Sequence, residues 1–339
     1  MTKRNIYIGI ILAVTATIVW SGNFIVARGV IKQIPPVSLA FYRWLMGSIF
    51  ILPIGYKKFR QEIPLIRKHW KYLLWVAFTG ITLYNTFLYV AGHYTPAINL
   101  ALIATTTSPI MAIALAAIFL KEKISLLRLA GLSICIVGIL LLLSQGNLDR
   151  LLGFHFSTGD WWLLAGALCF AVYNVLVKQK PVTISATSFL VAIFWAGTAM
   201  LLPAYLWEKN NNPPVVFDAK LLGIIVYLGL GACVISYLCW NAAIAKLGSG
   251  RTALFGNLIP IFSTLEAVLI LDERIMGIHL ISGALVITGL VLANISSPKS
   301  VPGTGSMPLK NAANKTSVNE ASLIKAGRSA NTTEEKNDY

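Results

Sequence analysis

One uncharged stretch limits what this chain can fold into. From Tyr72 to Leu120 there are 49 consecutive residues without an Asp, Glu, Lys or Arg. An aqueous fold does not bury such a segment, whereas a bilayer crossing needs about 20 apolar residues. The composition agrees, because 56% of the residues are hydrophobic and 12% are charged, against about 25% charged in soluble domains. The apolar runs are continuous and not alternating, which favours helices over a β-barrel.

The 28 Lys and Arg residues outnumber the 13 Asp and Glu residues. The basic residues lie in short loops between apolar runs, which is the topology signal of a membrane protein, so we expect no nucleic-acid partner. The four cysteines lie inside apolar runs without CxxC spacing. We therefore expect buried small side chains, without a disulfide or a metal site.

Charges and Gly/Pro clusters divide the chain into ten predicted membrane-spanning helices. The first five are 6–27, 36–56, 72–92, 98–120 and 127–144. The second five are 160–178, 184–207, 221–243, 251–271 and 277–295. From residue 297 the composition turns to Ser, Asn, Thr, Lys and Gly, so we expect 297–339 to be a disordered tail.

The distribution of basic residues predicts the orientation. Fifteen Lys and Arg residues lie in the N-terminal segment and in the loops after spans two, four, six and eight, and six lie in the opposite loops. The segment from Lys57 to Lys71 dominates this difference. Positive charge favours the cytoplasmic side, so both the N-terminus and the C-terminal tail are predicted to be cytoplasmic.

The chain also contains an internal repeat. A shift of 151 positions aligns Asn23 with Asn174 and Pro109 with Pro260, and SPIMAIALAAIFLKEK (108–123) then lies over IPIFSTLEAVLILDER (259–274). The predicted domains are a first repeat at 1–145, a connecting loop at 146–159, a second repeat at 160–296 and the tail at 297–339.

Five spans per repeat is an odd number, so corresponding helices cross the membrane in opposite directions. Inverted repeats are a recurrent construction of secondary transporters, in which two halves enclose a midplane site and exchange inward-facing and outward-facing states. A duplicated channel is the alternative. Saturation and counterflow would distinguish the two.

Three segments resemble a known family. They are Trp-Ser-Gly-Asn-Phe at 20–24, Phe-Tyr-Arg-Trp at 41–44, and the repeated block that ends in Lys-Glu-Lys and in Asp-Glu-Arg. This pattern resembles the drug/metabolite transporter superfamily, specifically the bacterial ten-helix EamA-type proteins. The resemblance implies an all-α transporter of the bacterial inner membrane that exports amino acids or small amphipathic metabolites. A metabolite or drug importer and a lipid-linked substrate carrier are alternatives within the superfamily.

Polar and aromatic residues inside the spans are the candidates for substrate binding. Thr82, Asn85 and Tyr89 share one face of span three, and the 151-residue shift maps them onto Cys233, Ser236 and Trp240. Such residues can hydrogen-bond a zwitterion and cover an apolar side chain, or they can pack helices together. The predicted substrate-binding set is Trp20, Asn23, Arg43, Thr82, Asn85, Tyr89, Tyr173, Asn174, Ser236, Tyr237 and Trp240.

Two members of this set carry particular expectations. Arg43 is the basic residue well inside a span and would suit a carboxylate, although its long side chain could instead reach the headgroups. Asn23 and its counterpart in span six each need a partner inside the membrane, which is either the substrate or another helix.

Glu266 stands in span nine where the resembled family usually has an apolar residue. A carboxylate inside a membrane helix is costly and suggests a functional role, and a buried carboxyl group could take up and release the protons of an antiporter. A structural role at the edge of the cavity is the alternative. Pro109 and Pro260 are predicted to kink spans four and nine.

No HExxH, GxSxG, P-loop or metal-ligand cluster occurs, so we expect neither an enzyme nor a cofactor. The expected partners are a small-molecule substrate and the lipid bilayer, in a monomer or a homodimer. Proton coupling, the substrate and the direction of transport are left open by the sequence.

Overall fold

The computed structural model describes residues 3–30, 33–94, 97–147, 149, 152, 157–271 and 277–295. All of them belong to one compact unit, Met1–Pro298. The predicted tail and half of the predicted connecting loop lie outside the described residues. So does the Asp-Glu-Arg segment at 272–274, which ends the second copy of the repeated block.

The described residues of the unit are helical through both repeats, as the sequence predicts. The first half contains α1 (Lys3–Val30), α2 (Pro36–Lys68), α3 (Trp70–Ala77), η1 (Phe78–Leu83), α4 (Tyr84–Tyr94), α5 (Ala97–Leu120) and α6 (Leu126–Ser144). The second half contains α8 (Thr158–Lys178), α9 (Ala186–Asn211), α10 (Ala219–Tyr227), η2 (Leu228–Ile235), α11 (Ser236–Leu247), α12 (Ser249–Leu254), η3 (Phe255–Leu258), α13 (Ile259–Leu271) and α14 (Gly277–Ile295).

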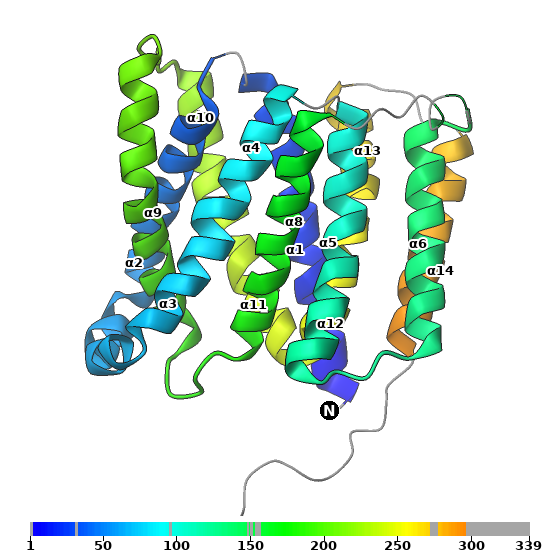
Figure 1. The fold of residues 1–339 in the computed structure, drawn as a ribbon, viewed down its shortest axis with the longest axis horizontal. Helices are drawn as coiled ribbons and strands as arrows, with labels where there is room; N and C mark the ends of the chain where they lie inside the picture. Colours follow the sequence, from blue (N-terminus) through cyan, green and yellow to red (C-terminus); the bar gives the residue numbers. More distant parts are fainter. Residues whose placement is uncertain are drawn as a thin grey trace, which may run out of the picture. The chain divides into compact units, whose positions relative to one another are not determined.

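The helices pack in pairs that follow the internal repeat (Figure 1). Helix α2 packs on its counterpart α9, and α6 packs on its counterpart α14. Helix α1 packs on α11, and the corresponding helices of the other half, α8 and α4, pack on each other. Each major pairing therefore maps onto itself or onto its equivalent when the halves are exchanged, as expected of two related repeats.

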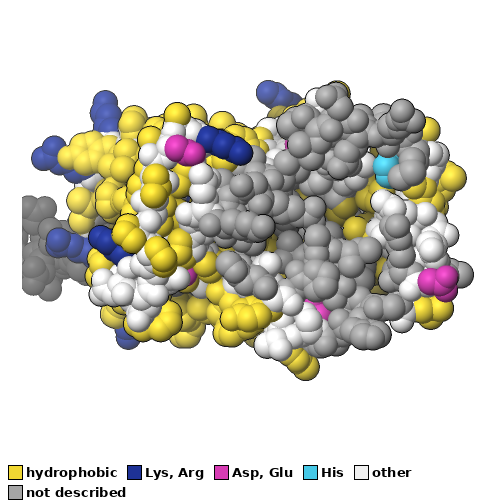
Figure 2. All heavy atoms as spheres, turned by 90° about the horizontal axis from the view of Figure 1, so that it is seen from above, with side chains coloured by type: hydrophobic (Ala, Val, Ile, Leu, Met, Phe, Trp, Pro, Cys, Tyr) yellow, Lys and Arg dark blue, Asp and Glu magenta, His cyan; other side chains and the backbone are white. Residues whose placement is uncertain are grey.

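Eight helical stretches in the described part of the chain are long and apolar enough to cross a membrane. Of α5, the stretch Thr107–Leu120 qualifies as a shorter apolar helix, and the ninth predicted span is divided into α12, η3 and α13. Large apolar side chains such as Trp75 and Trp207 are exposed. In the view from above, hydrophobic side chains (yellow) lie along much of the outline of the molecule (Figure 2). Such outward apolar surface suits contact with lipid.

Helix α2 is longer than predicted. The prediction ended the second span at residue 56 and left Lys57–Lys71 as a loop, but the helix continues to Lys68. This expectation was wrong because Phe59, Leu65 and Ile66 pack against the core. They give the extension an apolar face beneath its basic residues, and packing of that face stabilises the helix.

The α2–α9 pair is tied at both ends by acidic residues. Glu208 near the end of α9 accepts hydrogen bonds at the start of α2, from Ser38 N (2.6 Å) and Ser38 Oγ (2.8 Å). Glu62 near the end of α2 accepts one from Ser185 N (2.9 Å), just before α9. Each carboxylate thus supplies an acceptor to backbone donors that a helix start leaves unpaired.

Two π-helical segments occur at matching places in the repeats, η1 in the third span and η2 in the eighth. The sequence reasoning predicted regular helices there. Gly80 in η1 lies so close to the Tyr173 ring that a Cβ atom would stand 2.1 Å from it, and Gly80 O accepts a hydrogen bond from Tyr237 Oη (2.9 Å). Such π-helical turns occur frequently at functional sites, and the helices that follow them, α4 and α11, supply Tyr84 and Tyr237 to the wall of a cavity.

Candidate functional site

A cavity lies among the helices at the junction of the two halves. Its wall is formed by residues of α1, α2, α4, α5, α8, α11, α12, η3 and α13. The lining residues are Trp20, Asn23, Arg43, Tyr84, Asn85, Leu88, Ser108, Pro109, Phe170, Tyr237, Trp240, Ala253, Gly256 and Ile259. The wall therefore combines aromatic rings, amides and one guanidinium group, which is the mixture expected of a small-molecule site.

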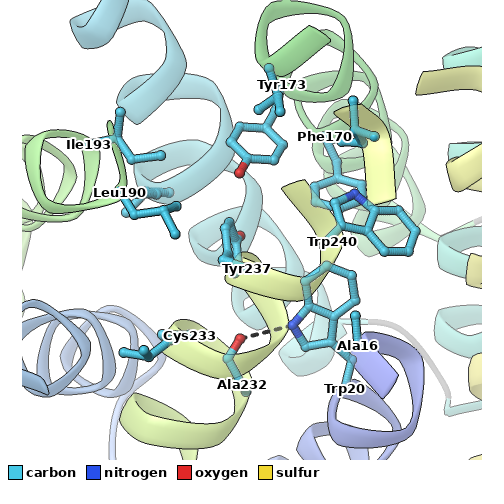
Figure 3. Packing of buried hydrophobic residues seen from close by; sticks show 14 of the residues in the cluster. Ala16, Trp20, Phe170, Tyr173, Leu190, Ile193, Ala232, Cys233, Tyr237 and Trp240 are labelled. Carbon is cyan, nitrogen blue, oxygen red and sulfur yellow. Dashed lines mark hydrogen bonds between the residues drawn. The ribbon is translucent and has the colours of Figure 1, made fainter. Parts of the chain in front are cut away.

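Aromatic rings from both halves line the cavity, and Figure 3 shows Trp20, Phe170, Tyr237 and Trp240 lying close together. Trp20 of α1 and Trp240 of α11 have ring centroids 4.9 Å apart. Phe170 of α8 stacks on Tyr84 of α4 at 4.5 Å and meets Trp20 edge-on at 5.8 Å. Trp20 Nε1 donates to Ala232 O (2.9 Å), the bond drawn as a dashed line. This bond fixes the indole, so the aromatic wall is largely preformed.

Arg43 is the cationic group of the cavity, and its side chain is 2% exposed. Its Nη1 donates to Tyr89 Oη (2.7 Å) and lies 3.5 Å from Asn23 Oδ1, while its Nε donates to Cys233 Sγ (3.1 Å). The amide of Asn23 carries no charge, and phenols and thiols of ordinary pKa are uncharged at about pH 7. Among the described residues no Asp or Glu pairs with Arg43. The alternative that it reaches the lipid headgroups is wrong, because the side chain is enclosed.

The second half has an equivalent but uncharged arrangement. Asn174 Oδ1 accepts a hydrogen bond from Trp240 Nε1 (2.7 Å), and these two residues correspond to Asn23 and Tyr89 of the first half. The Nδ2 atoms of Asn85 and Asn174 are buried without a hydrogen-bond partner in the described part of the chain. Asn85 lines the cavity next to the Tyr237 hydroxyl, so its amide is placed to contact a bound molecule.

The predicted substrate-binding residues divide into three groups. Those that line the cavity are Trp20, Asn23, Arg43, Asn85, Tyr237 and Trp240. Tyr89 and Asn174 lie behind it and hold Arg43 and Trp240 by hydrogen bonds. Thr82, Tyr173 and Ser236 are outside the lining and bond Gly197 O (3.2 Å), Asn241 Oδ1 (2.7 Å) and Ala16 O (3.5 Å) on other helices. For these three residues the structure favours the alternative of helix packing.

Sequence reasoning missed several residues of the wall. Tyr84 and Phe170 are the largest of them, and Leu88, Ser108, Ala253, Gly256 and Ile259 complete the set. A signal for the two aromatic residues was present, because Phe170 lies one helical turn before Asn174 and Tyr84 precedes Asn85. Pro109, predicted as a kink, also lines the wall inside the continuous helix α5, whereas Pro260 is the second residue of α13 and follows η3.

Glu266 lies outside the cavity lining. Its Oε1 is 2.6 Å from Ser21 Oγ on α1, and its Oε2 is buried without a hydrogen-bond partner in the described residues. The phenol of Tyr227 on α10 is near the same turn of α1, where it donates to Val19 O (2.8 Å). In this structure the Glu266 carboxyl group therefore does not face the cavity.

The two halves of the chain each match the EamA-like transporter family, at residues 7–144 and 157–295. The chain thus belongs to this family of multi-pass membrane transporters, and it contains two EamA repeats. One solved crystal structure superposes with a TM-score of 0.69 at 20% identity, over 87% of this chain and 98% of the other. At that identity the likeness concerns the fold alone.

Three relatives illustrate the similarity. An uncharacterized transporter of Archaeoglobus fulgidus is 28% identical over 84% of this chain and 96% of its own. A probable amino-acid metabolite efflux pump of Escherichia coli is 24% identical over 83% of this chain and 93% of its own. A probable terminal-alkyne amino-acid exporter of Streptantibioticus cattleyicolor is 27% identical over 83% of this chain and 91% of its own.

Proposed function

We propose that this EamA-family transporter exports amino acids, or small metabolites that combine a carboxylate with an apolar group, by alternating access. The observation that carries the proposal is the enclosed guanidinium of Arg43, which lines the cavity beside aromatic rings. Among the described residues it has neutral partners only. The cavity thus places the positive charge of Arg43 next to the apolar surface of the aromatic rings.

A buried cation without a counter-ion is costly, because an arginine side chain does not lose its proton in proteins. A substrate carboxylate would supply the missing negative charge, and the planar guanidinium can hold it through two parallel hydrogen bonds. The contacts with Tyr89 and Asn23 keep the Arg43 head group oriented. The charge-assisted hydrogen bonds to Arg43 would thereby contribute to the binding free energy of the substrate.

The aromatic wall accounts for the remainder of an amphipathic substrate. Trp20, Phe170 and Trp240 offer flat apolar surfaces for a side chain, and their faces also attract an ammonium group. Asn85 adds an amide group at the same wall. An amino acid carries the three matching groups, and two of the relatives are named for the export of amino acids or their metabolites.

The inverted repeats provide the transport cycle that we propose. The cavity lies between halves of related structure, so each half can take up the conformation of the other and open the site to the opposite side. The proposed location is the bacterial inner membrane, with both termini in the cytoplasm according to the excess of basic residues on that side. Export is the direction suggested by the relatives' names.

Counterflow in proteoliposomes tests this function. Vesicles that hold the full chain are loaded with one unlabelled amino acid at a time, and uptake of the same labelled amino acid is followed. Saturable counterflow for amino acids with apolar side chains is expected. Its absence across the whole panel would refute the substrate class, and flux without saturation would identify a channel.

A further inference from the structure

We propose that Glu266 is a proton-binding site which α13 presents to α1, and that one proton is bound and released there in each transport cycle. The proton site is inferred from contacts between α1 and α13. Its coupling to transport rests on the proposed function, because coupling needs a substrate that moves in the opposite direction to the proton.

A count of hydrogen atoms at Ser21 supports a protonated Glu266. Ser21 Oγ lies 2.5 Å from Ile18 O and 2.6 Å from Glu266 Oε1, and both are hydrogen-bond distances for oxygen pairs. A serine hydroxyl has one hydrogen and can donate to only one of two acceptors. If the Glu266 carboxyl group carries a proton, it donates to Ser21 Oγ while the serine donates to Ile18 O. Both contacts are then hydrogen bonds.

The second carboxyl oxygen leads to the same conclusion. Glu266 Oε2 is buried and has no hydrogen-bond partner among the described residues. Within the same residues Glu266 is in no ion pair. A carboxylate in such a place would leave negative charge unpaired inside the membrane, which is far more costly than an unpaired carbonyl oxygen of a neutral acid.

The neighbouring helices bring few ionisable groups to this place. Tyr227 of α10 is near Glu266, but its hydroxyl donates to Val19 O (2.8 Å). Of the elements packed on α13, α5 and η3 contain no ionisable residue, and α14 contains His279 in its first turn. Helix α1 has Lys3, Arg4 and Tyr7 at its start and Arg28 near its end. Within the described residues of these packed elements, Glu266 is thus the acidic group of the helix junction.

The position of Ser21 connects this site to the cavity. Ser21 lies on α1 between Trp20 and Asn23, which both line the cavity. Release of the proton would remove the bond donated by Glu266 and place a charge against α1, so α1 would have to shift or admit water. A bound substrate and a bound proton would then favour different positions of α1, which is the requirement for exchange.

Infrared difference spectroscopy tests the proton site without any substrate. The full chain in lipid vesicles is titrated with acid and base while the carbonyl band of protonated carboxyl groups is recorded. Wild type should show a titrating band of a buried acid that Glu266→Gln lacks. Ser21→Ala should shift the frequency and midpoint of this band, because it removes the hydrogen-bond acceptor. Identical spectra for wild type and Glu266→Gln would overturn the proposal.

Two further variants serve as controls in the same titration. Ser263 donates to Ser21 O (3.2 Å) and so joins the same two helices without touching the carboxyl group. Ser263→Ala should therefore leave the band in place, as should His279→Gln. If Ser263→Ala shifts the band as much as Ser21→Ala does, the hydroxyl of Ser21 is not the partner of the proton and the hydrogen count is wrong.

Coupling is tested in vesicles with labelled L-phenylalanine as the probe and a pH-sensitive dye inside. An outward gradient of L-phenylalanine should drive proton movement in wild type and in Ser263→Ala. In Glu266→Gln the protons moved per labelled molecule should fall to the background level. An unchanged ratio in Glu266→Gln would overturn the coupling. If L-phenylalanine is not exchanged even by wild type, the coupling is overturned for this probe. The full counterflow panel then decides the proposed function, and the infrared result still decides the proton site.

Discussion

Arg43 Nη1 donates to Tyr89 Oη across 2.7 Å, and the two places that correspond to these residues in the second half are taken by Phe194 and Trp240. Phe194 packs edge-on against Trp44 and Tyr237. The repeats thus differ in charge at this pair of positions, with a guanidinium group in the first half and aromatic rings in the second. Aromatic rings of both halves line the cavity, but Arg43 is the cation in its lining.

Tyr89→Phe should weaken substrate binding more than turnover. The substitution removes the acceptor that orients Arg43, and a hydrogen bond to a charged group contributes about 1.5–3 kcal/mol. We expect the KM of amino-acid counterflow to rise roughly tenfold or more, with a smaller change in kcat. Tyr42→Phe is the matched control, because the Tyr42 hydroxyl bonds Tyr205 (2.7 Å) at another place. Equal effects of the two variants would contradict the role given to Tyr89.

Gly80→Ala should destabilise the protein, whereas Gly223→Ala should not. A Cβ atom at Gly80 would stand 2.1 Å from the Tyr173 ring, while one at Gly223 has no neighbour within 4 Å. Forced overpacking costs about 1–3 kcal/mol. The midpoint of thermal unfolding of the purified protein in detergent measures the difference. If both variants unfold at the temperature of wild type, the close approach of η1 and α8 is not present in the folded protein.

Glu208→Ala should destabilise the α2–α9 pair more than Glu62→Ala. Glu208 is buried and accepts bonds from Val37 N, Ser38 N and Ser38 Oγ, so its removal leaves buried donors unpaired. Loss of a helix cap costs about 0.5–2 kcal/mol. Glu62 is half-buried and accepts one backbone bond. A larger loss of thermal stability for Glu62→Ala would contradict this order.

Asp218 should make folding stability depend on pH in the acid range. Its carboxylate accepts bonds from Leu221 N (2.7 Å) and Gln33 Nε2 (3.1 Å), and the Leu221 backbone bond is the main cause that lowers the pKa of Asp218. Because the pKa is lower in the folded state, this stabilisation is complete above the ordinary Asp pKa of about 3.9 and is lost as the pH falls through the folded value.

Thermal unfolding at a series of acid pH values measures this contribution. Asp218→Asn keeps a side-chain oxygen that can cap α10 but cannot titrate, so its stability should fall less steeply below pH of about 4 than that of wild type. Parallel stability curves for the two proteins would show that Asp218 makes no pH-dependent contribution.

The sequence predicted the helices and much of the cavity, for a physical reason. A polar residue such as Asn23, Asn85 or Arg43 is costly in lipid, so it must face the interior, and all three line the cavity. Apolar and aromatic residues carry no such signal by themselves, and only a neighbouring polar residue, such as Asn85 beside Tyr84, indicates their place. Tyr84 and Phe170 were missed because an aromatic ring suits a lipid face, a helix contact or a cavity wall equally well.

Local geometry was less predictable than the inventory of helices. The π-helical turns of η1 and η2 depend on packing between distant segments, such as Gly80 against Tyr173. No local sequence pattern predicts these turns. For Glu266 the sequence left open a proton-binding role and a structural role at the edge of the cavity. The carboxyl group faces α1 and lies outside the cavity lining. The position of a residue along a helix determines the direction of its side chain relative to that helix. It does not determine which neighbouring helix the side chain contacts.

The most direct test of the central claim is a competition for exchange of labelled L-phenylalanine in proteoliposomes. Unlabelled L-phenylalanine and its amine analogue without the carboxylate, phenethylamine, are compared as competitors in wild type, Arg43→Lys and Arg43→Met. We predict that in wild type the amino acid competes at least roughly tenfold better than the amine, as one charged hydrogen bond requires. Arg43→Lys should keep part of this preference and Arg43→Met should lose it. Equal competition by both compounds in wild type would contradict the claim that Arg43 binds a substrate carboxylate.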